Sequence, residues 1–225
     1  MTPRQLAFDL GTSENFTRTD FFASPANASA LASIDDWQVW PQGRLLLIGP
    51  EGAGKTHLAH IWASESDALI LPAVNLPELD PTRSPVRLVV EDADRQAGLP
   101  AFEEALFHLM NRTLAVGGQI LVTARKAPRD WGLGLPDLLS RLQSMPIARL
   151  DAPDDGLLSA VLVKLFADRQ IAVPPNLVPF LTSRMERSIA AARRLVADLD
   201  ARALALGRSV SRALAAELLD STDEG

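Results

Sequence analysis

The eight residues Gly49-Pro50-Glu51-Gly52-Ala53-Gly54-Lys55-Thr56 decide the fold of this chain. They follow an apolar run at 45–48 and lead directly into a segment with helical character at 57–66. A buried strand, a glycine-rich loop and a helix start form, in this order, the context that a phosphate-binding loop requires. The loop lets backbone N–H groups converge on one point, and the helix adds the positive end of its dipole. We therefore predict that all eight residues bind a nucleotide, with the Lys55 ammonium on the β- and γ-phosphates and the Thr56 hydroxyl on Mg²⁺.

The composition of the 225-residue chain restricts the alternatives. The absence of cysteine excludes disulfides and thiolate metal sites, so we expect a reducing compartment. No apolar run approaches the roughly 20 residues of a membrane span, which predicts a cytoplasmic protein with no membrane partner. The formal net charge is −6, from 22 basic and 28 acidic residues. An acidic surface disfavours direct binding to a nucleic-acid backbone.

Strand and helix patterns alternate along the first two thirds of the chain. We predict strands at 44–48, 68–71, 87–91, 119–123 and 147–150, and helices at 25–37, 55–66, 99–116 and 136–143. This alternation is typical of an α/β domain with a parallel five-stranded sheet and helices on both faces. Ser24 is expected to cap the helix at 25–37. The core face of the helix at 99–116 is expected to comprise Phe102, Leu106, Leu109, Met110 and Leu114.

The character of the sequence changes after Asp151, where only helices are predicted. They fall at 154–169, 175–185, 188–206 and 211–219, which indicates a small all-helical second domain. The chain then divides into a flexible peptide at 1–12, a nucleotide-binding domain at 13–150, a helical lid at 151–221 and a tail at 222–225.

Four polar residues outside the loop have positions suited to nucleotide chemistry. Glu91 and Asp92 end the apolar strand at 87–91, where the first acid would hold Mg²⁺ through water and the second would orient an attacking water. Glutamate is one methylene longer than the usual aspartate, so we expect weak or absent hydrolysis by the chain itself. Thr123 ends the strand at 119–123, where a hydroxyl either reads a γ-phosphate or serves no special purpose. Arg141 either stabilises phosphoryl-transfer charge in a neighbouring site or is a surface arginine.

The order of these features resembles an AAA+ P-loop NTPase over nearly the whole chain. Within that class, several segments resemble the initiator-related clade that contains DnaA, namely residues 36–58, Phe21-Phe22 with Asn27, Pro128 after Thr123, and Ser140-Arg141. The resemblance implies a cofactor, ADP or ATP with Mg²⁺. It also implies that Phe22 and Asn27 lie at the adenine, that Thr123 is the sensor-one residue and that Arg141 is an arginine finger.

The N-terminal stretch Gln5-Leu6-Ala7-Phe8-Asp9-Leu10 is similar to the clamp-binding peptide of the Hda-type regulators in this clade. In an extended peptide, Leu6, Phe8 and Leu10 would enter an apolar groove while Gln5 anchors it by hydrogen bonds. The alternative is a short strand that packs on its own domain. No basic recognition helix is predicted after the lid, so we expect no helix-turn-helix DNA-binding domain.

The lid departs from the family pattern. The resemblance places a sensor-two arginine near the start of the third lid helix, but the stretch 186–194 has alanine there, with Arg187 and Arg193 as candidate substitutes. The missing sensor-two arginine and the glutamate at position 91 together favour a protein that holds nucleotide as a switch and supplies Arg141 to the nucleotide site of another protein.

The resemblance implies a regulator of chromosomal replication initiation. It would bind nucleotide and the DNA polymerase III β sliding clamp, and stimulate hydrolysis of DnaA-bound ATP. Its partners would be DnaA and the clamp, with DNA reached only through the clamp, and homo-oligomer formation is left open. One alternative is a DnaC-like AAA+ loader or adaptor that binds a helicase or single-stranded DNA. Another is a stand-alone small NTPase.

Overall fold

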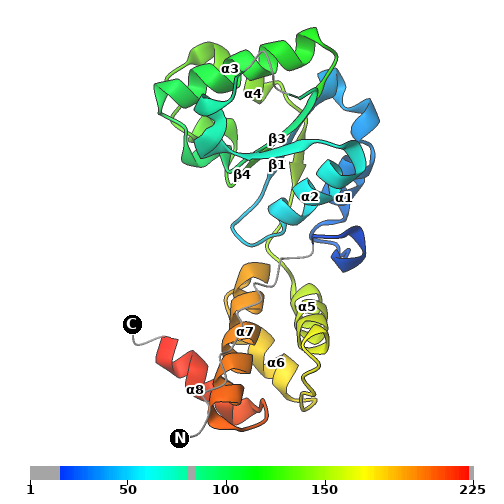
Figure 1. The fold of residues 1–225 in the computed structure, drawn as a ribbon, viewed down its shortest axis with the longest axis vertical. Coiled ribbons are helices and arrows are strands. Elements are labelled where there is room, and N and C mark those ends of the chain that lie inside the picture. The colour runs from blue at the N-terminus through cyan, green and yellow to red at the C-terminus, as the bar shows by residue number, and fades with distance from the viewer. Residues whose placement is uncertain (1–15, 81–84, 223–225) are drawn as a thin grey trace, which may run out of the picture.

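The computed structural model describes residues 16–80 and 85–222, which form an α/β domain and a helical domain joined end to end (Figure 1). The predicted clamp-binding residues Gln5, Leu6, Phe8 and Leu10 therefore lie outside the described residues. Within the described ranges, no helix combines the length and the apolar character needed to cross a membrane.

Five parallel strands form the sheet of the α/β domain, in the order β2-β3-β4-β1-β5. They are β1 (Arg44–Ile48), β2 (Leu69–Pro72), β3 (Arg87–Glu91), β4 (Gln119–Ala124) and β5 (Ile147–Arg149). The five predicted strands are confirmed nearly to the residue, because each is an apolar run bounded by polar or turn-forming residues. β1 lies between β4 and β5, with Ile48 opposite Ala124 and Arg149. The carboxyl ends of these strands therefore meet at one edge of the sheet.

Helices cover both faces of the sheet, as the burial of successive residues along β1, β3 and β4 requires. One face packs on α1 (Ala28–Asp35) and α2 (Lys55–Ser66), through side chains such as Leu47, Val89 and Leu121. The other packs on α3 (Pro100–Ala115) and α4 (Pro136–Gln143), through side chains such as Leu46, Val90 and Val122. Figure 1 shows the two helix pairs on opposite sides of the strands.

Short 3₁₀ helices join these elements. They are η1 (Arg18–Asp20), η2 (Trp37–Val39), η3 (Pro41–Gly43), η4 (Ala73–Glu78), η6 (Ala93–Arg95) and η7 (Pro128–Asp130).

The lid domain consists of α5 (Asp155–Asp168), α6 (Leu177–Thr182), α7 (Ile189–Leu206) and α8 (Arg212–Thr222). Its core is separate from that of the sheet and is built from leucine, valine and phenylalanine on all four helices. Asp154 caps α5 by accepting the Leu157 N–H at 2.7 Å, and Ser188 caps α7 by accepting the Ala191 N–H at 3.2 Å. The predicted architecture, an α/β core with a parallel five-stranded sheet followed by an all-helical domain, is thus confirmed.

Two local predictions were wrong. Helix α1 begins at Ala28, and Ser24 does not cap it, because the Asn27 carboxamide accepts the Ser24 N–H and closes a turn over residues 24–27. Leu114 is 47% exposed rather than part of the core. In the last turn of α3 the inward face is taken by Thr113, whose hydroxyl donates to the Leu109 carbonyl, and the next residue is rotated away from the sheet.

Candidate functional site

The predicted phosphate-binding loop follows β1 and ends at the first turn of α2. The Gly49 N–H donates to the Ala124 carbonyl at 3.2 Å, so the loop begins beside the end of β4. A Cβ on Gly49 would lie 2.6 Å from the Leu150 carbonyl oxygen, so only glycine fits there. Gly54 is the N-cap of α2 with φ +103°, a conformation that favours glycine. The helix therefore starts with unpaired N–H groups at the mouth of the loop, where an anion is favoured.

Lys55 places an ammonium group inside this loop. Its Nζ donates to the carbonyls of Gly49 and Pro50, both at 2.9 Å, and the residue is only 7% exposed. Burial lowers the pKa of Lys55, while the nearby carboxylates of Asp92, Asp94 and Glu51 oppose that shift. These three carboxylates help to keep the buried ammonium charged.

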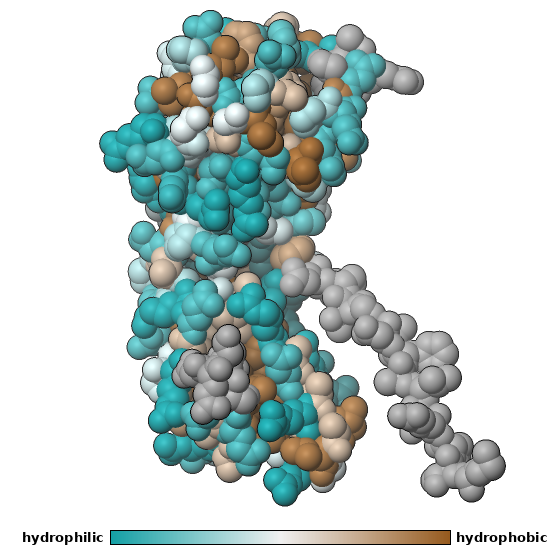
Figure 2. Space-filling view, turned by 90° about the vertical axis from the view of Figure 1, so that its left-hand side faces the viewer, coloured by the Kyte–Doolittle hydropathy of each residue, from teal (hydrophilic) through white to brown (hydrophobic). Residues whose placement is uncertain are grey.

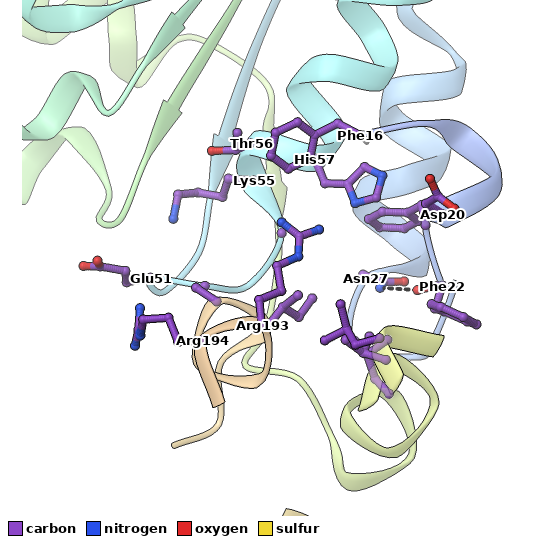
Figure 3. Close-up of a pocket in the computed structure, with 18 of the residues that line it drawn as sticks. Phe16, Asp20, Phe22, Asn27, Glu51, Lys55, Thr56, His57, Arg193 and Arg194 are labelled. Carbon is purple, nitrogen blue, oxygen red and sulfur yellow. Dashed lines mark hydrogen bonds between the residues drawn. The ribbon is translucent and has the colours of Figure 1, made fainter. Parts of the chain in front are cut away.

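A cleft of about 780 Å³ extends from the loop to the lid. Such a volume suits a nucleotide-sized ligand. The molecule narrows at the junction of the two domains, and the face shown in Figure 2 is mostly hydrophilic there. Residues from four places line the cleft: the strap (residues 16–27), the loop with α2, the ends of β3 and β4, and the lid helices α5 and α7 (Figure 3).

The strap forms one wall of the cleft and brings two predicted residues, Phe22 and Asn27, to it. Asn27 is 3% exposed, and its side-chain amide donates to the Phe22 carbonyl at 2.8 Å (Figure 3). The strap is tied to α2 by a 2.8 Å contact between His57 Nε2 and the Thr17 carbonyl. It is tied to the lid by an ion pair of 3.0 Å between Asp20 and Lys164 on α5.

The predicted residues at the strand ends occupy different surroundings. Asp92 lines the cleft, whereas Thr123 is buried and its hydroxyl accepts the Asp92 N–H at 3.0 Å. That bond links the ends of β3 and β4. The Glu91 carboxylate is not among the lining groups, and its Oε1 is buried without a hydrogen-bond partner.

The donor set fits a hydrated Mg²⁺ of the kind that phosphate-loop proteins hold. Thr56 lines the cleft and carries a hydroxyl oxygen, whereas the unpartnered Glu91 Oε1 is buried and Glu91 is not a lining residue, so of these two residues Thr56 offers the oxygen donor at the cleft. Within the described ranges, no three His, Cys, Asp or Glu residues form a group able to hold a metal ion. A magnesium ion here would therefore take most of its ligands from phosphate and water.

The sequence analysis missed several charged residues that line the cleft, among them Arg95 and Arg125. Arg95 pairs with Glu51 of the loop at 3.3 Å and with Asp92 at 3.4 Å, and Arg125 pairs with Asp94 at 2.9 Å. Arg95 and Arg125 line the cleft. The available signal was their place after β3 and β4, since ligands of parallel sheets bind beyond the carboxyl ends of the strands.

Helix α7 contributes the lid side of the cleft. Arg193 and Arg194 line it one turn after Ala190, and Figure 3 shows the Arg193 side chain pointing from the lid towards Lys55 and His57. The Arg193 guanidinium also lies 5.3 Å from the centre of the Phe16 ring. Arg187, the other candidate, pairs with Asp155 at 2.8 Å and is not a lining residue. Of the two candidates, Arg193 is therefore the one at the cleft.

The start of α7 touches the loop directly. The Ile189 N–H donates to the Gly52 carbonyl at 2.9 Å, and the Ser188 side chain packs against Gly52. Lid and loop are thus in backbone contact.

Arg141 has a different location from the other predicted site residues. It lies on α4, outside the residues that line the cleft, with its guanidinium 4.9 Å from the centre of the Phe107 ring. It is close enough to Arg44 to lower the pKa of that residue, although burial is the larger cause. Arg44 begins β1, whereas the loop follows the end of β1, so Arg141 lies towards the opposite edge of the sheet.

Helix α4 is held by a buried carboxylate. Glu103 on α3 accepts the N–H groups of Gly98, Gly134 and Leu135 at 2.8, 3.0 and 2.7 Å, the last directly before α4.

Solved structures share this fold. Domain III of the replication initiation protein DnaA from Thermotoga maritima superposes with a TM-score of 0.81 at 20% sequence identity, covering 92% of this chain and 97% of that domain. AMPPCP-bound DnaA from Aquifex aeolicus superposes with a TM-score of 0.70 at 14% sequence identity, covering 83% of this chain and 65% of that one. The RuvB Holliday junction branch migration motor from Thermotoga maritima superposes with a TM-score of 0.64 at 19% sequence identity, covering 87% of this chain and 66% of that one.

The chain has the fold of AAA+ P-loop domains, an α/β core followed by a helical lid. More particularly, the fold is DnaA-like and matches DnaA domain III over nearly its full length. No family model matches the sequence.

Proposed function

We propose that this protein is a nucleotide-dependent regulator of replication initiation, which binds ADP or ATP in the interdomain cleft and acts on ATP held by DnaA. The loop, the buried Lys55 and the cleft volume support nucleotide binding. The DnaA-like fold, with one such structure carrying AMPPCP, supports an adenine nucleotide and a role in initiation.

In the proposed complex the loop N–H groups of residues 49–56 and the Lys55 ammonium bind the phosphates. Phe22 and Asn27 of the strap lie at the adenine, and Arg193 approaches the phosphates from the lid. Thr56 and, through water, Glu91 would hold Mg²⁺, which screens phosphate charge when bound. Because the lid and the strap both line the cleft, the bound nucleotide would fix the lid against the α/β domain.

The proposal that this protein acts on DnaA-bound ATP rests on the location of Arg141. This arginine lies outside its own cleft and rests on Phe107 with Arg44 nearby, so its charge is not used by the nucleotide of its own chain. A guanidinium held in this way suits insertion into the ATP site of a neighbouring subunit, where it would stabilise the charge of the transferring phosphoryl group. We propose that this neighbour is DnaA, with Arg141 as the arginine finger.

We further propose that Gln5 to Leu10 dock on the sliding clamp, with Leu6, Phe8 and Leu10 in an apolar groove and Gln5 as anchor. Docking on a DNA-loaded clamp would raise the concentration of this protein near DnaA, so weak individual contacts would suffice. DNA would then be a partner only through the clamp.

The arginine-finger proposal is tested by measuring hydrolysis of DnaA-bound ATP with clamp, DNA, nucleotide and this protein. Arg141→Ala should remove most of the stimulation, since an arginine finger is worth about 10³–10⁵-fold in GTPases. Arg129→Ala is the matched control, because that side chain is 77% exposed and pairs only with Asp130 among the described residues. Full stimulation by Arg141→Ala would refute this mechanism.

Clamp docking is tested separately by a pull-down with clamp. The double change Gln5→Ala with Leu6→Ala should abolish capture while nucleotide binding stays intact, because neither substitution changes a residue that is proposed to bind nucleotide. Unchanged capture would contradict docking through this peptide.

A further inference from the structure

Asp92 is a cleft-lining carboxylate whose backbone is held in an uncommon conformation. Its φ is +55°, a left-handed value that aspartate adopts more readily than most residues other than glycine. The Thr123 hydroxyl accepts the Asp92 N–H at 3.0 Å, and the Asp92 carbonyl accepts the Arg95 N–H at 3.0 Å. Among the carboxylates that oppose the lowering of the Lys55 pKa, Asp92 has the largest effect. The backbone therefore fixes this acid near the ammonium group of the loop.

One arginine joins the Asp92 side chain to the loop. Arg95 Nε pairs with Asp92 Oδ2 at 3.4 Å, while Arg95 Nη2 donates to Glu51 Oε2 at 3.3 Å. All three residues line the cleft. The two carboxylates contact different nitrogens of the guanidinium, so both contacts form at the same time. We call the group of Glu51, Arg95 and Asp92 the clasp.

The clasp bears on the water-orienting role that the sequence predicts for Asp92. In hydrolysis of a nucleoside triphosphate, a water oxygen bonds to the γ-phosphorus, and the bond from that phosphorus to the β–γ bridging oxygen breaks. The electron pair of the broken bond stays on the diphosphate, and the water proton passes to the carboxylate and then to solvent. The carboxylate must therefore turn towards that water. In the clasp, one Asp92 oxygen is turned towards Arg95 instead.

We propose that Arg95 restrains Asp92 and so limits hydrolysis of a triphosphate bound in the cleft of its own chain. Arg95 is then a positioning residue, because it acts through Asp92 and touches no reacting atom. The side chains of Arg95, Glu51 and Asp92 are 44%, 69% and 47% exposed. Ion pairs this exposed are weak, so the restraint is modest and reversible. This inference rests on the nucleotide binding proposed above and names a regulation of the same site.

The first experiment measures single-turnover hydrolysis of ATP by the full chain. Arg95→Gln should raise the rate about two- to fivefold, the range that an exposed ion pair supports. The double change Arg95→Gln with Asp92→Asn should lose this gain, because the released carboxylate is then absent. Arg129→Gln is the matched control and should keep the original rate, since Arg129 is 77% exposed and is not a lining residue. Arg95→Met carries the comparison if the glutamine variant fails to fold.

A second experiment needs no nucleotide. Hydrogen exchange of the loop at 49–54 should be about twofold faster in Arg95→Gln than in the unchanged protein, because Glu51 loses its tie to the end of β3. The Arg129→Gln control should exchange like the unchanged protein.

Three results would overturn the inference. One is an equal rate of hydrolysis in the unchanged protein and in a folded Arg95 variant, including no hydrolysis by either. Another is a gain that persists in the double variant, which would mean that Arg95 does not act through Asp92. The third is unchanged hydrogen exchange of the loop in Arg95→Gln, which would exclude the clasp. Absence of AMPPCP binding by the unchanged protein in calorimetry would instead refute the proposed nucleotide binding, so the two failures are distinguishable.

Discussion

Replacing Gly52 by alanine should separate the lid from the phosphate-binding loop. A Cβ at Gly52 would lie 1.9 Å from the Ser188 Oγ and 2.8 Å from the Ser188 Cβ. The φ of Gly52 is +71°, which an alanine adopts only with strain. The same contact includes the bond from the Ile189 N–H to the Gly52 carbonyl at 2.9 Å. The added methyl group therefore forces Ser188, and with it the start of α7, off the loop.

The size of the effect follows from these contacts. A left-handed φ costs an alanine about 1–2 kcal/mol. Displacing Ser188 loses the cap that accepts the Ala191 N–H, worth about 1 kcal/mol, and the Ile189 bond contributes about as much again. Gly52→Ala should thus lower the free energy of unfolding by about 3 kcal/mol and also weaken nucleotide binding, because loop and lid both line the cleft.

Urea unfolding of a double-mutant cycle isolates the steric part. Ser188→Gly removes the obstructing side chain and by itself costs a few tenths of a kcal/mol, since glycine is a tolerable N-cap. In that background Gly52→Ala should cost about 1–2 kcal/mol less than alone, which is a measurable coupling. Gly132→Ala supplies the control for backbone strain, because Gly132 has φ +76° and nothing within 4 Å of an added Cβ. Additive costs within about 0.5 kcal/mol would refute the proposed contact between loop and lid.

Three further predictions concern the lid, the support of α4 and pH. Arg193→Ala should weaken ADP binding about tenfold in calorimetry, as expected for the loss of a cationic contact. Arg187→Ala is the control, because Arg187 pairs with Asp155 outside the cleft, and it should leave ADP affinity unchanged. Equal effects of the two substitutions would contradict the role of Arg193 as the lid arginine of the cleft. Glu103→Ala should lower the urea-unfolding free energy by about 3 kcal/mol, because it leaves three backbone N–H groups without their charged acceptor, and a loss under about 0.5 kcal/mol would contradict that role. Burial is the main cause that lowers the pKa of His57 from 6.5 in the folded protein. As the pH drops below about 6.5, the unfolded chain therefore binds a proton at His57 before the folded protein does, and the free energy of unfolding falls. His57→Gln should reduce this loss of stability between about pH 7.5 and 5.5, and an identical loss in the variant would exclude His57 as its source.

Much of the fold was predictable because its signals are local. Each strand is a short apolar run, and the helices of the lid show apolar residues at helical spacing, so both kinds of element were found close to their true bounds. The errors came where a neighbouring side chain competed with the local pattern. Ser24 was predicted to cap a helix, but the Asn27 side chain accepts its N–H and holds residues 24–27 in a turn. Thr113 occupies the inward position that was predicted for Leu114.

The candidate site was only partly predictable for the same reason. The Gly49 to Thr56 spacing predicts a phosphate-binding loop, because the chain itself supplies every N–H group and the lysine. Asp94 and Arg125, in contrast, carry no local signal. They meet because β3 lies beside β4 and β4 beside β1, an order set by the whole sheet.

The sequence by itself therefore determined the loop, the alternation of strands and helices and the presence of a lid, since each depends on residues adjacent in the chain. Only the tertiary structure decided which charged side chains share the cleft. It brought Arg193 to the cleft, left Arg187 on Asp155, used the Thr123 hydroxyl to join two strands and set Arg141 apart on α4. The physical reason is that charges interact through space, and the packing of the sheet and of α7 fixes the distances between them.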